Sequence, residues 1–252
     1  MARIIVFDSG FGSLSIIKPI QQAVKSDIIY FADQKNFPYG QKSILELTKI
    51  ITKRLKLFEE KFKPDLIVVG SNTPSLLVQI KKKNVIKVLP PIKMAAKISV
   101  TGNIAILATH ATVKSKKLSE FIKKNKLARR INIKKINASK LVQLVESVKF
   151  IDDKNLCKRT INKVLSQEFS KYNIDVATLS STHLPFLLSF FNKQFPTVNF
   201  LDPGQEVADK VRNAVKKPSK RNSMKIFTSS KPEKFQKDLS KIGIKQKVTF
   251  LN

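Results

Sequence analysis

Short apolar runs alternate along the chain with longer segments in which apolar residues recur every three to four positions. Continuous apolar runs are typical of strands buried on both faces, and the longer period is typical of helices. The expected strands cover residues 3–7, 27–33, 66–70, 87–92, 103–109, 131–138, 175–181, 198–204, 225–229 and 247–251. The expected helices cover residues 14–25, 43–62, 75–83, 115–125, 140–148, 155–172, 186–194, 206–215 and 233–242.

Strands that alternate with helices form mainly parallel sheets covered on both faces, so the expected fold class is α/β. The second half of the chain repeats the scheme of the first, which predicts two pseudo-symmetric α/β domains. Proline-rich turns at residues 90–91 and 202–204 are the expected crossing points. The first domain is then discontinuous, residues 1–92 plus 204–252, and the second is residues 93–203.

The charge balance is strongly basic. In 252 residues, 48 Lys and Arg face 18 Asp and Glu, for a formal net charge of +30. Such a charge attracts nucleic acid, anionic lipid or small anions. The basic clusters at residues 81–83, 123–135 and 216–221 hold almost no aromatic residues for base stacking. This favours a solvated basic surface, with non-specific nucleic-acid contact as the alternative.

Cysteine usage and hydropathy exclude several classes of protein. The one cysteine, Cys157, excludes a disulfide framework and a zinc cluster, and its helical context favours a buried apolar role over a reactive thiol. No window of eighteen apolar residues occurs, so no membrane span is expected. The N-terminal apolar run is too short for a signal peptide, which predicts a cytoplasmic location.

Short polar clusters follow four of the expected strands, and each is expected to begin a helix. They are Asp8-Ser9-Gly10, Ser71-Asn72-Thr73, Thr109-His110-Ala111-Thr112 and Ser181-Thr182-His183. Ligands of open α/β sheets bind beyond the carboxyl ends of strands, and helix starts favour anions such as carboxylates. Capping alone explains most single clusters of this kind, but four clusters divided evenly between two halves favour a binding site.

Residues of these clusters, and those of a fifth element around residue 39, each have a structural and a functional interpretation. Pro38-Tyr39-Gly40 forms either a simple turn or an element that brings backbone amides and the Tyr39 hydroxyl to a site. Asp8 either caps a helix, orients a catalytic group or binds an ammonium group. His183 either starts a helix or carries protons, since the ordinary pKa of histidine is about 6.5.

Two serines take matching places. Ser71 lies six residues after Asp65, and Ser181 lies six residues after Asp175. Each follows an apolar run of strand length. The two halves of the chain therefore present a hydroxyl at the end of corresponding strands.

Six stretches carry a resemblance to a known family, from near residue 3 to near residue 250. They are IIVFDSGFGSLS, YFADQKNFPYGQKS, LIVVGSNTPS, SSTHLPFLL, LDPGQEVA and FTSSKPEKF. In order and spacing the chain resembles glutamate racemase, of the aspartate/glutamate racemase superfamily. The resemblance implies two α/β domains with a ligand cleft between them, an acidic amino acid (glutamate or aspartate) as substrate, and no cofactor. It leaves a homodimer open.

The resemblance also implies a role for each cluster. The substrate carboxylates and amino group would be held by Asp8, Ser9, Pro38, Tyr39, Gly40, Asn72, Thr73, Thr112 and Thr182. Two acid/base groups, one from each domain, would remove the Cα proton from one face and deliver a proton to the other. Asp8, His183 and Glu146 would assist these two groups.

The sequence departs from the family where these two groups stand. The family has cysteine at both positions, and this chain has Ser71 and Ser181. A thiol with a pKa of about 8.5 is a far better proton acceptor at neutral pH than a hydroxyl, and a racemase base has to hold the proton itself. Racemisation by the serines, with Asp8 and His183 as alternative bases, is expected to be severely impaired.

Milder departures are Ser13, Pro74 and Leu184, where the family has glycine, alanine and tyrosine. Two other functions stay open. One is a non-catalytic binding protein for an acidic amino acid or dicarboxylate. The other is a basic nucleic-acid-associated protein.

Overall fold

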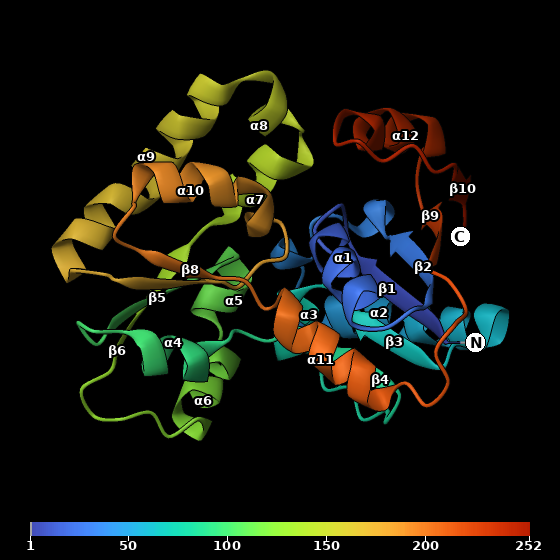
Figure 1. The fold of residues 1–252 in the computed structure, drawn as a ribbon, viewed down its shortest axis with the longest axis horizontal. Coiled ribbons are helices and arrows are strands. Elements are labelled where there is room, and N and C mark those ends of the chain that lie inside the picture. Colours follow the sequence, from blue (N-terminus) through green and yellow to red (C-terminus); the bar gives the residue numbers. More distant parts are fainter. Residues whose placement is uncertain (1) are drawn as a thin grey trace. The chain divides into compact units, whose positions relative to one another are not determined.

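The computed structural model describes residues 2–252, which divide into two compact units (Figure 1). The first unit contains residues up to Val88 together with Gly204–Asn252, and the second contains Leu89–Pro203. The sequence-based division places the first crossing later, after residue 92. Every strand pairing in the described chain is parallel, and the α/β fold class is confirmed.

The first unit is built on a six-stranded sheet with the order β10-β9-β2-β1-β3-β4. Its strands are β1 (Arg3–Asp8), β2 (Asp27–Ala32), β3 (Leu66–Val69), β4 (Val85–Lys87), β9 (Ser223–Thr228) and β10 (Val248–Phe250). Its helices are α1 (Leu14–Ala23), α2 (Ile44–Phe62), α3 (Asn72–Leu77), α11 (Gly204–Ala214) and α12 (Pro232–Lys241), with short 3-10 helices η1 (Gln34–Asn36) and η2 (Tyr39–Gln41).

Aromatic residues on neighbouring positions pack against opposite faces of this sheet. Phe58 of α2 contacts Phe7 and Phe31, with ring centroids 5.1 and 5.2 Å apart. Tyr30 instead contacts Phe235 of α12, at 6.5 Å. Successive strand residues point to opposite faces, so α2 covers one face and α12 the other. These fully buried rings anchor the core of the unit.

The second unit is built on a four-stranded sheet with the order β6-β5-β7-β8. Its strands are β5 (Asn103–Ala108), β6 (Asn132–Asn137), β7 (Val176–Leu179) and β8 (Asn199–Leu201). Its helices are α4 (Ile92–Ile98), α5 (His110–Lys114), α6 (Lys116–Lys124), α7 (Ser139–Glu146), α8 (Lys149–Asp152), α9 (Lys154–Tyr172) and α10 (Leu188–Gln194), with a 3-10 helix η3 (Leu184–Leu187).

Two adjacent residues of β8 mark the two faces of the second sheet. Phe200 stacks on Phe191 of α10 at 5.0 Å and contacts Phe169 of α9 at 6.1 Å. Leu201 packs instead against the buried cluster that includes Ala95 of α4. Figure 1 shows α9 and α10 on one face of this sheet and α4 on the other.

Local structure differs from the sequence-based expectation around residues 72–98. The helix expected at 75–83 is α3, which starts earlier and ends at Leu77, where Val78 becomes extended. A proline in the first turn, Pro74, is tolerated there, and the lysines at 81–83 are exposed. The strand expected at 87–92 is β4, which ends at Lys87 because the prolines that follow cannot donate ladder hydrogen bonds. Helix α4, not predicted, begins directly after them.

The spacing between each aspartate and its serine reflects one strand length. Asp65 accepts the Arg3 N–H at 2.8 Å just before β3. Asp175 accepts the N–H groups of Val100 and Thr101, at 2.6 and 3.0 Å, just before β7. Each aspartate thus fastens the amino end of a four-residue strand.

Within residues 2–252, no helix is both long enough and apolar enough to cross a bilayer.

Candidate active site

The carboxyl ends of three neighbouring strands bring the predicted residues of the first unit together. Asp8 ends β1, Asp33 follows β2, and Ser71 lies two residues beyond β3. The Asp33 N–H donates to the Asp8 carbonyl at 2.7 Å, and the Gly70 N–H donates to the Phe7 carbonyl at 2.8 Å. This edge, with the η2 segment, is called the first cluster: Asp8, Ser9, Pro38, Tyr39, Gly40, Ser71, Asn72 and Thr73.

Asp8 is buried and held in one orientation. Its Oδ1 accepts the Ser9 N–H at 2.6 Å and lies 3.4 Å from the Ser9 hydroxyl. The expectation that this cluster starts a helix is wrong, because α1 begins only at Leu14. The loop between β1 and α1 is held by the Tyr30 hydroxyl, which donates to the Gly10 carbonyl. Asp8 therefore presents a fixed negative charge at the sheet edge.

Tyr39 has its hydroxyl committed to a neighbouring carboxylate. It is 1% exposed and donates to Asp33 Oδ2 at 2.9 Å. Burial, followed by the charges of Asp33 and Asp8, raises the pKa of Tyr39 well above its ordinary value. The Tyr39 proton is thus used to hold the Pro38-Tyr39-Gly40 segment in place.

Asp33 is the centre of a buried network that sequence reasoning missed. Its Oδ1 accepts from Arg54 Nη2 at 2.7 Å and from the Ser229 hydroxyl at 2.8 Å. Arg54 also lies over the Phe31 ring, at 5.2 Å from the centroid. A signal was available: Arg54 interrupts the apolar stripe of α2, and a charge on a buried helix face requires a buried partner.

Ser71 occupies the N-cap position of α3 without capping it. Its side chain is half-buried and makes no capping hydrogen bond. Asn72 and Thr73, which follow it, are buried, and Asn72 Nδ2 donates to the Val88 carbonyl at 3.4 Å. The Ser71 hydroxyl is therefore not used up in stabilising the helix start.

Gly70 is required where β3 turns into α3. A Cβ at this position would lie 2.2 Å from the Ser13 Cβ and 3.0 Å from the Phe7 carbonyl oxygen. The loop after β1 consequently packs directly on the residue before Ser71. Ser13 itself is fully buried, and its hydroxyl has no hydrogen-bond partner within the described residues.

The second unit gathers its predicted residues in the same way, at the ends of β5 and β7. This edge is called the second cluster: Thr112, Ser181, Thr182 and His183, together with Glu146. Thr112 is fully buried, and its hydroxyl lies 3.1 Å from that of Thr109. Ser181 is 5% exposed, and its carbonyl accepts the Leu184 N–H at 3.0 Å at the start of η3.

His183 pairs with a carboxylate from another helix. Its Nε2 lies 3.0 Å from Glu146 Oε2, at the end of α7. Both side chains are largely buried, at 5% and 13% exposure. A histidine nitrogen bonded to a carboxylate has its orientation fixed, which suits it to holding or relaying a proton. His183 also precedes η3, so both interpretations of this residue agree with its position.

The thiol of this chain belongs to neither cluster. Cys157 is fully buried in α9. Burial, with a smaller contribution from the charge of Asp153, raises the pKa of the Cys157 thiol to about 11. Cys157 is thus a core residue. Among residues 2–252, no group of three or more His, Cys, Asp or Glu side chains is placed to hold a metal ion.

Comparisons with known proteins relate this chain to glutamate racemases. No protein-family model matches this chain. The curated glutamate racemase of Actinobacillus pleuropneumoniae serotype 7 is 31% identical over 246 residues, which cover 93% of this chain and 91% of that protein.

Solved structures show the same fold. Glutamate racemase from Bacillus anthracis has a TM-score of 0.86 at 22% identity, covering 100% of this chain and 97% of that chain. Escherichia coli glutamate racemase, solved with L-glutamate and the activator UDP-MurNAc-Ala, has a TM-score of 0.84 at 24% identity, covering 99% and 98%.

Proposed function

Because this chain belongs to the glutamate racemase family, we propose that its two clusters bind glutamate and that its serines leave racemisation severely impaired. One observation carries the proposal. Hydroxyls stand at the ends of β3 and β7, and the one thiol, Cys157, is buried in a helix with a raised pKa. The E. coli relative, solved with L-glutamate, supports glutamate as the ligand.

The binding part of the proposal rests on groups that suit glutamate. Asp8 supplies a buried negative charge for the substrate ammonium group. Asn72, Thr73, Thr112 and Thr182 supply buried polar side chains near helix starts, where backbone N–H groups favour carboxylates. These groups do not depend on a thiol, so binding is expected to survive the replacement of the acid/base pair.

The catalytic part of the proposal rests on proton affinity. Racemisation requires one group to remove the Cα proton and a second group to donate a proton to the opposite face. A thiol has a pKa of about 8.5, whereas the pKa of an alkyl hydroxyl is several units higher and close to that of water. Each unit corresponds to about 1.4 kcal/mol, so the whole difference in proton affinity is on the order of 10 kcal/mol. A site that offset half of this free-energy difference by other interactions would still racemise roughly 10³–10⁴-fold more slowly than a site with two thiols.

A second route to weak turnover uses other residues. Asp8 from the first cluster and His183 from the second are both buried, and Glu146 holds the His183 ring. These two side chains are the alternative bases. Residual exchange that persists in Ser71→Ala and Ser181→Ala variants, and is abolished by His183→Ala, would assign it to this route.

The central experiment follows Cα deuteration of L- and D-glutamate in D₂O by NMR. We expect exchange by the natural chain to be at least about 10³-fold slower than exchange by the Ser71→Cys/Ser181→Cys double variant. Ser180→Cys is the matched control, since Ser180 is also buried beside Ser181 but is bonded to Thr178 at 2.8 Å. It should give no gain. Fast exchange by the natural chain would overturn the impairment.

Binding is tested separately by calorimetry with L-glutamate, D-glutamate and L-aspartate. Heat of binding without Cα exchange supports the impaired racemase, and equally the non-catalytic binding protein that the sequence left open. Restored exchange in the double-cysteine variant favours the former. Absence of heat and of any thermal shift would contradict glutamate binding.

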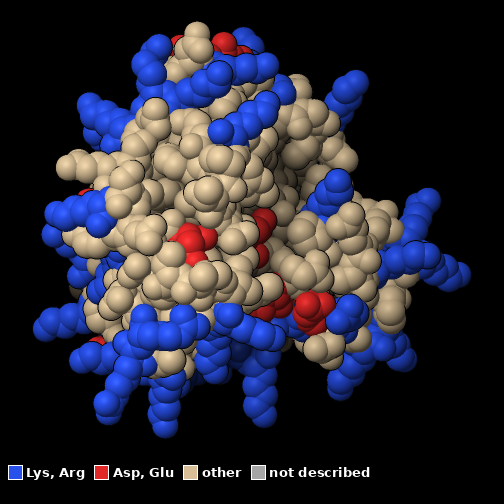
Figure 2. Space-filling view, turned by 60° about the vertical axis from the view of Figure 1, so that its left-hand side comes forward, with Lys and Arg blue, Asp and Glu red and all other residues tan. Residues whose placement is uncertain are grey.

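The basic surface is proposed to be a general electrostatic feature. Figure 2 shows lysine and arginine side chains projecting outward, mostly around the edge of the visible face, and several acidic residues nearer its centre. Any DNA binding should weaken smoothly with salt and show no sequence preference. A sequence-specific complex with DNA at 0.2 M salt would contradict this.

The cytoplasmic location and the homodimer stay predictions. Cell fractionation tests the first, and light scattering tests the second.

A further inference from the structure

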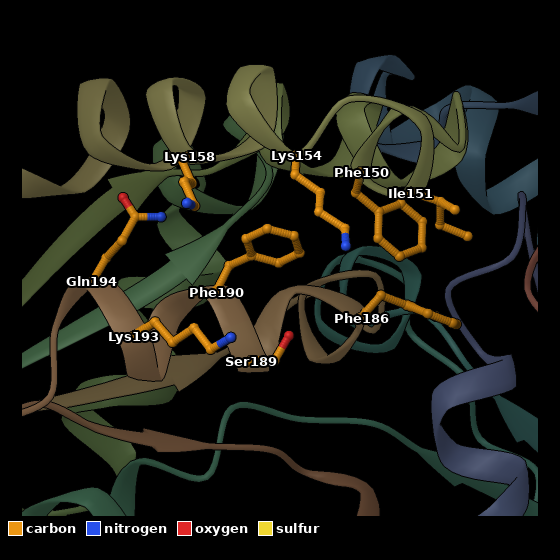
Figure 3. A pocket seen from close by; sticks show the side chains of 9 residues that line it. All are labelled: Phe150, Ile151, Lys154, Lys158, Phe186, Ser189, Phe190, Lys193 and Gln194. Atoms are coloured by element: carbon orange, nitrogen blue, oxygen red, sulfur yellow. The ribbon is translucent and has the colours of Figure 1, made fainter.

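A cavity in the second unit lies between the end of α8, the start of α9, and the η3–α10 segment. Its volume is about 390 Å³, within the range of small-molecule sites. It is lined by Phe150, Ile151, Lys154, Lys158, Phe186, Ser189, Phe190, Lys193 and Gln194 (Figure 3). Aromatic rings and lysines therefore share one hollow, which is called the α9–α10 cavity below.

The apolar wall is made by three phenylalanines. Phe150 and Phe186 meet edge to face, with ring centroids 6.1 Å apart. In Figure 3 the ring of Phe190 lies between the side chains of Lys158 and Lys154, and the Lys154 ammonium points toward the space beside Phe150. A planar ring in this space would be in contact with aromatic side chains and close to a cation.

Three lysines line the cavity: Lys154, Lys158 and Lys193. No acidic side chain is part of the lining. Three like charges around one hollow repel one another, and a bound anion would relieve that repulsion.

Gln194 is the independent sign of a missing polar partner. Its amide nitrogen and amide oxygen are both buried, and neither has a hydrogen-bond partner in the described chain. Leaving a buried amide group without a hydrogen-bond partner destabilises the folded protein. Figure 3 shows this amide at the Lys158 end of the cavity. A ligand that both donates and accepts hydrogen bonds, or one anionic oxygen with a water, would satisfy it.

We propose that the α9–α10 cavity is a binding site for a small aromatic anion, a planar ring that carries a sulfonate, carboxylate or phosphate. The phenylalanines take the ring, and the lysines with Gln194 take the anionic group. Tight binding requires both the ring and the anionic group. A bare anion leaves the phenylalanine side chains in contact with water, and a neutral ring leaves the lysines and the Gln194 amide without partners in the ligand.

The test measures binding to the full chain by calorimetry with three probes: naphthalene-1-sulfonate, sulfate and 1-naphthol. The sulfonate should bind with one-to-one stoichiometry, at least about 10-fold more tightly than sulfate and than 1-naphthol. Equal binding of sulfate and the sulfonate would show that positive charge alone binds the anion, and would contradict the proposal. Equal binding of 1-naphthol and the sulfonate would show that apolar contact alone binds the ring, and would contradict it as well. Absence of binding by all three probes would overturn the proposal.

Variants locate the site. Lys154→Met with Lys158→Met should weaken the sulfonate by at least about 10-fold and change 1-naphthol by less than about 2-fold. Lys163→Met is the matched control, an exposed lysine of the same helix outside the cavity lining, and should change neither. Phe190→Ala should weaken both aromatic probes. The lysines are exposed, so the double variant remains informative even if Phe190→Ala does not fold. A control as weak as the double variant would also refute the site.

Discussion

Buried serines of the first unit differ in what their hydroxyls contact. Ser75 donates to the Val69 carbonyl at 3.0 Å and accepts the Val88 N–H at 3.1 Å, which ties the ends of β3 and β4 together. Ser13 is equally buried, but its hydroxyl has no partner within residues 2–252. The same side chain therefore stabilises one position and destabilises the other.

Replacing each of these serines by alanine should have opposite effects. Ser13→Ala should raise the free energy of unfolding by about 1 kcal/mol, because it removes an unpaired buried hydroxyl from a position whose φ of −70° suits alanine. Ser75→Ala should lower it by about 1–3 kcal/mol, because two backbone groups lose their partner. Urea denaturation measures both, and a shift of the same sign in both variants would contradict the assignment.

The thiol of Cys157 should be inert in the native protein. With a pKa of about 11, about one thiol in a thousand is ionised at pH 8, and the side chain is fully buried. Ellman's reagent should therefore react slowly until the protein is unfolded with guanidinium. The Ser71→Cys variant, with a half-buried second thiol, provides the reactive comparison. Immediate reaction of one thiol in the natural chain would disprove this.

At the scale of elements, Asp175 fastens the turn between α4 and β5 to the start of β7. Its carboxylate accepts from the Ser99 hydroxyl at 2.6 Å and from the N–H groups of Val100 and Thr101. Burial alone would raise the pKa of Asp175, but these hydrogen bonds hold it below its usual range. A depressed folded-state pKa means that the stabilisation is present above the unfolded pKa and is lost as the pH falls through the folded one.

Asp175→Asn should consequently destabilise the protein in a pH-dependent manner. At pH 7 the free energy of unfolding should fall by about 1–3 kcal/mol, because charge-assisted hydrogen bonds are lost. The difference from the natural chain should begin to shrink as the pH falls below about 4, where Asp175 of the unfolded chain becomes protonated, and it should vanish at lower pH, where the folded-state carboxylate becomes protonated as well. Asp209→Asn, at an exposed pair with Arg212, should change stability by less than about 0.5 kcal/mol. A pH-independent loss would rule out the ionised carboxylate as the cause.

At the scale of the whole molecule, the net charge of +30 acts on stability. Most of the observed ion pairs involve partly exposed side chains, such as Lys56 with Glu60 at 3.8 Å, and contribute little. The excess of positive charge repels itself in the folded state, and salt screens that repulsion.

Thermal stability should therefore rise with ionic strength. Raising sodium chloride from about 20 to about 200 mM should increase Tm by about 2–5 °C, as measured by circular dichroism. Sucrose at matched osmolality is the control, because it adds no screening. A Tm that falls with added salt would show that attractive ion pairs outweigh the repulsion.

By itself, the sequence determined the α/β class, the order of nearly all strands and helices, and the two serines at matching strand ends. Local periodicity suffices for this, because burial on both sheet faces demands continuous apolar runs and a helix demands a 3.6-residue repeat. The predicted ends of helices and strands were wrong where the pattern of apolar residues fitted more than one kind of element. An apolar stretch before lysines was taken as helix at 78–83, and the segment ending in Pro90-Pro91 was taken as strand.

Only the tertiary structure decided which polar groups meet. Asp33 and Ser229 are 196 residues apart in sequence, and His183 and Glu146 are 37 apart, yet each pair is within hydrogen-bond distance. The α9–α10 cavity likewise joins side chains from four elements, none of which is unusual in its own segment. Such contacts depend on where folded elements pack. A one-dimensional pattern records the burial of each residue but not the identity of its neighbours.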